Sequence, residues 1–332
     1  MQTAKPHRWY HLTPDRLILV LLPVEGLLWL SERLGWFSFN EHKGWTVLIA
    51  IAVVGIAMLF MLGWFFAAVV FRWRFQYSIR SLMVLTVAVA LPFSWLAVEM
   101  KEAKEQREAV EEFKKLYGEV GQLYYDYEYI TFRSPFTNPE PPGPVWLREL
   151  LGGDLFASVA SVELYGSKVT DAGLEQLRGM TQLVDLNLHG ADVTDTGLEH
   201  LKRLTRLEVL SLCGTKVTDA GLEHLKGLTQ LFFLALEGDR ITDAGLEHLK
   251  GLTQLRQLNL GGTQVTDAGL DRLKGLAQLR QLLLDNTQVT DAGLECLKGM
   301  SQVNELNLKG TKVTDEGVQR LQQALPNCTI TH

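Results

Sequence analysis

The chain has 332 residues, of which 47% are hydrophobic, and a formal net charge of −6 at pH 7. Residues 1–98 carry eight Lys/Arg against four Asp/Glu, whereas residues 155–332 carry 17 against 22. The acidic C-terminal half argues against nucleic acid as a ligand, and the three scattered cysteines fit neither a disulfide framework nor a metal-binding motif.

Long apolar runs lie within the first hundred residues. Trp45–Phe71 contains no charged residue and is long enough to cross a bilayer with tilt, and Leu82–Val98 is a second such run. Leu17–Leu30 is shorter and contains Glu25, and a charge inside a spanning helix costs about 2.5–3.5 kcal/mol on insertion scales. The sequence therefore predicts an all-α membrane region over residues 1–98 with two or three transmembrane helices, at about 17–34, 45–71 and 81–98.

The distribution of basic residues predicts the orientation of these spans. If all three cross the membrane, the basic N-terminal tail and the loop Arg72–Arg80 lie on one side, which the positive-inside rule makes cytoplasmic. The residues after the third span are then extracytoplasmic. Lysines just beyond that span, beginning with Lys101, argue for the opposite orientation, which would also result if residues 17–34 do not span.

Residues 99–121 are predicted to form a charged helical stalk. Val110, Phe113 and Tyr117 form an apolar stripe along it at helical spacing, and Gly118 and Gly121 end the helix. The stripe is short for a coiled coil, so we expect the stalk to continue the last membrane helix as a single helix.

Residues 122–154 are predicted to contain a strand, a proline-rich linker and an N-terminal cap. Leu123–Phe132 alternates and is rich in tyrosine, which favours a strand, and Ser134–Pro144 holds five prolines. Pro144 can begin a short helix through Leu151. A repeat array needs a cover over its first unit, and the side chains predicted to form this lid are Trp146, Leu147, Leu150 and Leu151.

A 24-residue repeat occupies the rest of the chain. Thr-Asp pairs recur at this spacing seven times, from Thr170–Asp171 to Thr314–Asp315. A fixed period of this length indicates a solenoid, in which each unit covers the apolar face of its neighbour. In the unit that begins at Leu183, Leu186 and Leu188 alternate with polar residues as in a short strand. The following Thr-Asp pair is predicted to cap a short helix.

The copy LEVLSLCGTKVTDAGLEHLKGLTQ, at residues 207–230, resembles the leucine-rich repeat. The resemblance covers residues 155–332, as seven copies and a terminal half-coil, LPNCTITH. It implies an α/β leucine-rich repeat solenoid, a horseshoe with a parallel sheet on its concave face, preceded by the all-α transmembrane region. Many such families place Asn at the turn after the strand, where it bonds the next coil. This chain mostly has hydroxyl residues there, as at Thr215, and we expect them to bond the next coil more weakly.

The segment Arg72–Tyr129 is also similar to a membrane-proximal module of bacterial leucine-rich repeat proteins. This resemblance implies a bacterial membrane protein. Together with the orientation of the spans, it predicts an integral protein of the bacterial inner membrane, whose repeats lie on the extracytoplasmic side.

No catalytic motif is found, and the chain is predicted not to be an enzyme and to use no cofactor or metal. It contains no glycine-rich phosphate loop, HExxH or CxxC sequence. His200, His224 and His248 recur once per coil, but helices that pack about 8–10 Å apart hold them too far apart for a shared metal site. Their spacing is better explained by a solvated helix face. The aspartate of each Thr-Asp pair is explained by helix capping rather than by calcium binding.

The outward positions of the strands are the candidate binding site, for a protein or peptide ligand. Phe233 is the only Phe or Trp among them and lies in the fourth of seven coils, so an apolar centre with a polar rim is predicted around it. An isolated, functionally silent Phe is an equally good interpretation. The residues predicted for the site are Tyr165, Asn187, His189, Val209, Ser211, Cys213, Phe233, Ala235, Glu237, Asn259, Leu283, Asp285 and Asn307.

Three functional hypotheses follow. The first is a membrane-anchored interaction module or scaffold that binds its partner on the concave face. The second is a structural envelope protein whose repeats self-associate without a specific ligand. The third and weakest comes from the similarity of the VTDAGL repeats to those of F-box substrate adaptors in ubiquitin ligation, since nothing that resembles an F-box precedes them.

Overall fold

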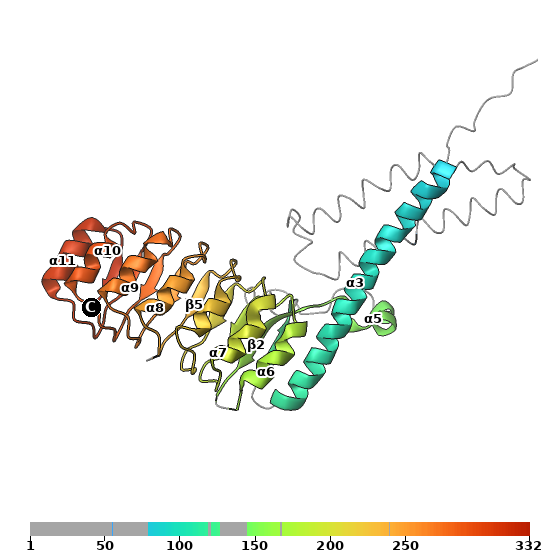
Figure 1. The fold of residues 1–332 in the computed structure, drawn as a ribbon, viewed down its shortest axis with the longest axis horizontal. Coiled ribbons are helices and arrows are strands. Elements are labelled where there is room, and N and C mark those ends of the chain that lie inside the picture. Colours follow the sequence, from blue (N-terminus) through green and yellow to red (C-terminus); the bar gives the residue numbers. More distant parts are fainter. Residues whose placement is uncertain (1–54, 56–78, 119–120, 127–144, 167, 239) are drawn as a thin grey trace, which may run out of the picture. The chain divides into compact units, whose positions relative to one another are not determined.

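A computed structural model describes residues 55, 79–118, 121–126, 145–166, 168–238 and 240–332 (Figure 1). The chain divides into two compact units. One combines Met1–Lys104 with Phe136–Ala157, and the other combines Glu105–Pro135 with Ser158–His332 and contains all the repeats.

The repeats are built on one nine-stranded sheet whose strands follow one another in chain order. β1 is antiparallel to β2, and every later neighbour is parallel. The parallel sheet and its one-strand-per-repeat order are those of the predicted solenoid. The strands are β1 (Gly121–Tyr125), β2 (Val159–Leu164), β3 (Asp185–Asn187), β4 (Val209–Ser211), β5 (Phe233–Ala235), β6 (Gln257–Asn259), β7 (Gln281–Leu283), β8 (Glu305–Asn307) and β9 (Thr329–Thr331).

Each strand is short because only its central leucine and the leucines that flank the strand must reach the core. Leu210, Leu234 and Leu258 are in register on adjacent strands and are buried, while the residues on either side point away from the core. Alternation along a strand sends successive side chains to opposite faces. The predicted inward assignment of the strand leucines is therefore confirmed.

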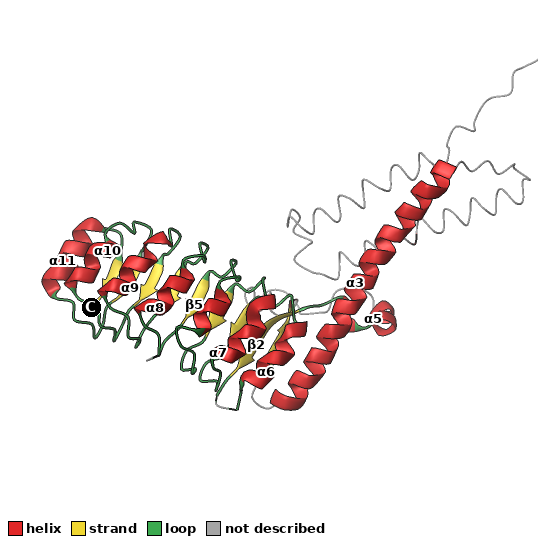
Figure 2. Ribbon diagram, viewed as in Figure 1, coloured by secondary structure: helices red, strands yellow, loops and turns green. Residues whose placement is uncertain are grey.

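Short helices cover the other side of the sheet (Figure 2). Most repeats have an α-helical turn that continues as a 3-10 helix, and their leucines, such as Leu198 and Leu201, are fully buried. The helical segments are α6 (Asp171–Glu175), η3 (Gln176–Gly179), α7 (Asp195–Leu198), η4 (Glu199–Arg203), η5 (Gly221–Leu225), α8 (Asp243–Leu246), η6 (Glu247–Leu249), α9 (Asp267–Arg272), η7 (Leu273–Gly275), α10 (Asp291–Leu297) and α11 (Asp315–Ala324).

The turn after the strand uses its hydroxyl residue differently from the prediction. Thr215 Oγ1 donates to the Leu212 carbonyl oxygen of its own coil at 2.8 Å, and the threonines of the later coils do the same at 2.6–2.7 Å. The prediction that these hydroxyls bond the next coil is wrong. The preceding glycine has a positive φ, 68° at Gly214, which folds the threonine back over its own strand. Backbone amides bond the next coil instead, as Gly214 N–H does to Glu237 O at 2.9 Å.

The long helix α3 (Ile79–Tyr117) covers the third predicted span and most of the predicted stalk. Its stripe of Val110, Phe113 and Tyr117 is buried in the core of the repeats, and Phe113 is only 1% exposed. Gln106 Oε1 accepts a hydrogen bond from the Val159 backbone N–H of the first coil at 3.1 Å. The unit that contains the repeats therefore begins at Glu105, inside the segment predicted as a stalk.

The predicted helix after Pro144 is present as α5 (Val145–Leu151), followed by η2 (Gly153–Leu155). Its Trp146 and Leu150 side chains are 65% and 72% exposed, and the side chains of Leu147 and Leu151 lie outside the described residues, so the lid stays a prediction. The first coil is covered by α3 from Glu105 onward and by β1, which pairs with β2.

Among the residues described, no helix is long and apolar enough to cross a membrane. The predicted spans at 17–34 and 45–71 lie outside these residues, apart from Gly55. Of the third, residues 81–93 are described only as helical backbone.

Candidate functional site

The predicted site residues lie together in three rows, which we call the strand face. Register places Asp185, Val209 and Phe233 side by side in the first row. The second row lies two residues further along each strand and includes Asn187 and Ser211. The third row, the exit edge, follows the strands where the chain leaves the sheet. The backbone N–H of the residue after each member donates to the carbonyl oxygen of the next member, as Gly166 does to His189. The members are Tyr165, His189, Cys213, Glu237, Gly261, Asp285 and Lys309.

The apolar centre is smaller than predicted. Val209 and Phe233 are paired and half-buried, but Cys213 and Ala235 are 7% and 3% exposed. A methyl or thiol group does not rise above larger neighbours on the adjacent strands, which lie about 4.8 Å away. The accessible apolar surface at the centre of the strand face therefore belongs mainly to Phe233 and Val209.

Two carboxylates on the exit edge lie two coils apart, and each accepts a hydrogen bond from an asparagine side chain of the next coil. Asn259 Nδ2 donates to Glu237 Oε2 at 3.3 Å, and Asn307 Nδ2 donates to Asp285 Oδ1 at 3.1 Å. Gly261 lies between them and carries no side chain. A Cβ at Gly261 would lie 3.0 Å from Asp285 Oδ1, so the glycine leaves room for that carboxylate.

The strand face also extends onto β1, which sequence reasoning did not assign to the site. Leu123 and Tyr125 pack on the core, so the alternate residues Gln122 and Tyr124 face the other way, opposite Glu163 and Ser161 of β2. The alternation was visible in the sequence. The antiparallel pairing that brings β1 beside the first repeat was not, because it joins segments about forty residues apart.

The N-terminal end of this face is aromatic and acidic. The Tyr165 hydroxyl donates to Glu163 Oε2 at 2.9 Å, and the tyrosine is 42% exposed. Partial burial, together with the Glu163 carboxylate beside it, raises the pKa of Tyr165 to about 12. The phenol therefore stays neutral at any physiological pH and acts as a donor.

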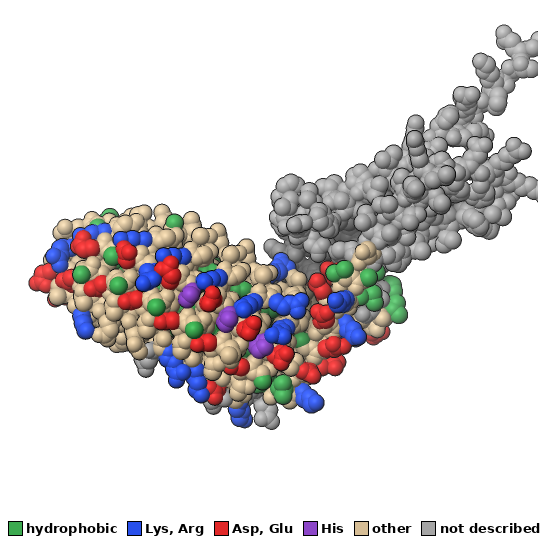
Figure 3. Space-filling model, in the orientation of Figure 1, with side chains coloured by type: hydrophobic (Ala, Val, Ile, Leu, Met, Phe, Trp, Pro, Cys, Tyr) green, Lys and Arg blue, Asp and Glu red, His purple; other side chains and the backbone are tan. Residues whose placement is uncertain are grey.

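The opposite, helix-bearing side has a different electrostatic character (Figure 3). Acidic residues there pair with a lysine three residues later in the helix, as Glu223 does with Lys226 at 3.3 Å and Glu247 with Lys250 at 2.6 Å. Such exposed pairs contribute little to stability, but they neutralise the charge of this surface locally.

The aspartate of each Thr-Asp pair has a different role from the predicted helix cap. The threonine is the N-cap residue, and the aspartate bonds the next coil: Asp219 accepts from the Thr242 backbone N–H at 2.8 Å and from its hydroxyl at 2.6 Å. The same two bonds recur at all six junctions from Asp171 to Thr314. These carboxylates therefore have structural partners.

The histidines form a line across the helix-bearing side (Figure 3). His200, His224 and His248 are half-buried rather than fully solvated, and their Nδ1 atoms have no hydrogen-bond partner. Within the described part of the chain, no three His, Cys, Asp or Glu side chains are grouped as metal ligands.

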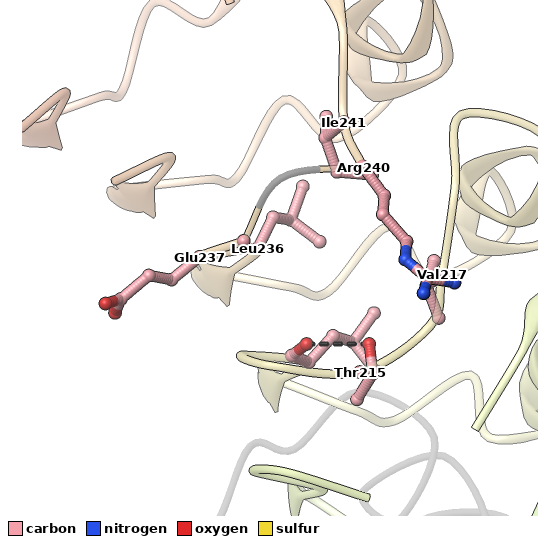
Figure 4. A pocket seen from close by; sticks show the side chains of 8 residues that line it. Thr215, Val217, Leu236, Glu237, Arg240 and Ile241 are labelled. Atoms are coloured by element: carbon pink, nitrogen blue, oxygen red, sulfur yellow. Dashed lines mark hydrogen bonds between the residues drawn. The ribbon is translucent and has the colours of Figure 1, made fainter. Parts of the chain in front are cut away.

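A shallow hollow lies beside Glu237, between the third and fourth coils (Figure 4). Leu236 and Ile241 form its apolar wall, and Arg240 and Thr215 line its rim. Its cavity volume of about 10 Å³ is far below the roughly 300–1,000 Å³ typical of small-molecule sites. The hollow is therefore too small and open to hold a small ligand by itself.

One family model and two solved structures are similar to parts of the chain. A family model described as "Leucine Rich repeat" matches residues 251–274 and 302–321. An internalin (inlF) from Listeria monocytogenes str. 4b F2365 is 27% identical, over 47% of this chain and 49% of its own, with a TM-score of 0.40. An internalin C2 (inlC2) of the same strain is 24% identical, over 54% of this chain and 86% of its own, with a TM-score of 0.41.

The chain thus spans about half the length of the first of these structures. No curated protein matches the chain. The family match falls on two copies of the 24-residue unit, and each copy contributes one strand to the parallel sheet and one helix to its outer side. The leucine-rich repeat model thus matches two copies of the unit, and the other copies share their 24-residue period and their place in the sheet.

Proposed function

We propose that this protein is a membrane-anchored interaction module that binds a protein or peptide ligand on the strand face of its leucine-rich repeats and has no catalytic activity. The observation that carries the proposal is the strand face itself. Its three rows of side chains are presented together by the sheet, while the core is built from the leucines behind them.

Phe233 is the expected energetic centre of this face. Binding energy at interfaces concentrates in a few large side chains that lose water near the middle of a patch. Phe233 is half-buried, is paired with Val209, and lies in the fourth of seven coils. Polar and charged positions surround it, as in an interface with an apolar core and a polar rim.

We also propose that the repeats are anchored in a bacterial inner membrane and lie on its extracytoplasmic side. The support is the apolar run Trp45–Phe71, the run Leu82–Val98, and the basic residues of the N-terminal tail and of Arg72–Arg80. A reporter that is active only outside the cytoplasm should work when fused after His332 and fail within the Arg72–Arg80 loop. The reverse pattern would place the repeats in the cytoplasm.

Self-association by stacking of repeats is less well supported. Head-to-tail stacking would need an open apolar core at the first coil, and that end of the core is covered by the buried Phe113 and Tyr117 of α3.

Site-directed photo-crosslinking in the full chain tests the proposal. A photoreactive residue is placed at Phe233 on the strand face or, as the control, at the exposed Glu223 on the helix side. We expect a discrete adduct with another protein from position 233 alone. The binding free energy of the partner protein found in this way should weaken by about 1–3 kcal/mol in the Phe233→Ala variant. It should stay unchanged in the His224→Ala variant. Adducts only between copies of this chain would favour self-association, and identical adducts from both positions would contradict the proposed site.

A further inference from the structure

The carboxylates of the strand face differ in their ion pairing from a row of carboxylates on the helix side. On the helix side, Glu199, Glu223, Glu247, Asp271 and Glu295 each pair with a lysine three residues later. The strand face carries five carboxylates and one lysine, Lys309. Across the described residues, four of those five take part in no ion pair: Glu163, Glu237, Asp285 and Glu305. The strand face is thus a surface of uncompensated negative charge, whereas the five helix-side acids named above are each paired with a lysine.

In the middle coils, the negative charge lies at one end of the strands and positive charge at the other. Glu237 and Asp285 lie on the exit edge, while the exposed Arg256 and Arg280 stand just before β6 and β7, at the opposite ends of these strands. Gly261 keeps the exit edge open between the two carboxylates, which are two coils and therefore about 10 Å apart. A cationic group is attracted to the exit edge and repelled from the other one, so the surface can orient what it binds.

We propose that the strand face docks an extended segment of a partner protein that is rich in lysine or arginine, with its basic side chains at Glu237 and Asp285 and an apolar side chain against Phe233. The assignment of this face rests on the proposed function, and the class of partner rests on the charge. An extended chain advances about 3.3 Å per residue and turns every second side chain to the same face, so long basic side chains two or four positions apart would reach both carboxylates. The central Phe233 and the polar rim supply the apolar and orienting contacts that an interface of this kind needs.

Selection from a library of random ten-residue peptides against the full chain in lipid nanodiscs tests this proposal. We expect the selected peptides to be enriched in lysine and arginine, with an affinity that falls as salt is raised. The double variant Glu237→Gln/Asp285→Asn should bind a selected basic peptide about tenfold more weakly. The control Glu223→Gln/Glu247→Gln removes the same charge from the helix side and should change the affinity less than about twofold.

Lys309→Gln provides a check of opposite sign. It removes the only ammonium group of the strand face, next to Asp285 in the following coil, and should tighten the binding of the same basic peptide by about two- to threefold. A variant that had merely lost structure would not bind more tightly. An unchanged or weaker affinity for Lys309→Gln would count against the proposal.

The remaining outcomes separate this proposal from the proposed function. If the selected peptides are neutral or acidic and lose binding with Phe233→Ala, the strand face is a binding site but its partner is not basic. If the helix-side control weakens binding as much as the strand-face variant, the attraction is a general property of an acidic chain, and the proposal is overturned. If no peptide depends on Phe233, Glu237 or Asp285, the proposal and the proposed site both fail.

Discussion

Asp219 and Thr242 join two consecutive coils through two hydrogen bonds, one to the Thr242 backbone N–H at 2.8 Å and one to its hydroxyl at 2.6 Å. We call this pair of bonds the coil clamp. Bonds to a charged carboxylate are stronger than neutral ones, and one clamp forms at each of six junctions. The Thr-Asp repeat is therefore explained by contacts between coils.

Removal of one clamp should measurably destabilise the array. Asp219→Ala leaves the Thr242 N–H and hydroxyl without their acceptor, at a cost of about 1–3 kcal/mol in the free energy of unfolding. Glu223→Ala, which removes an exposed carboxylate of the same coil, should change it by less than about 0.5 kcal/mol. Chemical denaturation of both variants measures the difference, and equal stabilities would show that the clamp contributes nothing.

The glycine of the VTDAGL phrase should be coupled to the clamp of the previous coil. A Cβ at Gly245 would overlap Asp219 Oδ1, so Gly245→Ala should destabilise the protein by about 1–3 kcal/mol. In an Asp219→Ala background the closest obstruction is gone, and only the flexible Leu222 side chain, whose Cδ1 would lie 3.0 Å from the new Cβ, must still shift. The same change should then cost clearly less than in the parent chain, also because alanine is the better helix former.

A double-mutant cycle of these two substitutions measures the coupling. Additive effects would mean that Gly245 is present for another reason.

The terminal clamps should make stability depend on acid pH. At Asp291, the Thr314 N–H and hydroxyl lower the pKa of the carboxyl. At Asp171, burial opposes ionisation, but hydrogen bonds from Thr194 and Thr196 outweigh it and the pKa is also lowered. A lowered folded-state pKa gives stability that is present above the unfolded value, about 3.9, and is lost as pH falls through the folded value.

Unfolding followed between pH 5 and pH 2.5 checks this dependence. Asp291→Asn should be less stable than the parent chain at pH 5, and the gap should narrow as pH falls. A gap that stays constant throughout this range would indicate that ionisation of Asp291 does not contribute.

The end of α3 should behave as part of the repeat core. Phe113 is 1% exposed and Leu116, one turn of the helix away, is 57% exposed. Phe113→Ala should cost about 3–5 kcal/mol, whereas Leu116→Ala should stay within about 0.5 kcal/mol. Thermal or chemical unfolding distinguishes them, and similar stabilities would argue against packing of this helix on the first coil.

A fragment that begins at Gly143 lacks both α3 and β1 and should be less stable than one that begins at Glu99.

The sequence predicts the repeated part of the fold well because each residue's role depends on local periodicity. Leu186 and Leu188 alternate with polar residues, so their inward direction follows from strand geometry alone. The covering of the first coil could not be obtained in this way. Phe113 and β1 pack on the first repeat, some forty residues later in the sequence. A contact that is made only once between such distant segments produces no repeating pattern in the sequence.

The same distinction applies to individual side chains. Asp219 sits beside a helix start, and capping is the local explanation, yet its partners lie 23 residues later in the next coil. On the strand face the rows were predicted because they follow from the period. The burial of Ala235 and the extension onto Tyr124 were not, because the first depends on the size of neighbouring side chains and the second on the pairing of β1.

Because of the coil clamp, a whole 24-residue unit can be duplicated or deleted while the contacts between coils are kept. Each unit carries an aspartate for the unit after it, and a threonine and a glycine for the unit before it. If recombination between copies duplicates or deletes one whole unit, every new junction again has all three partners. An insertion or deletion of any other length separates at least one aspartate from its threonine. We therefore expect the number of coils to vary among related genes in whole units, while the segment from Glu105 to the first coil stays single.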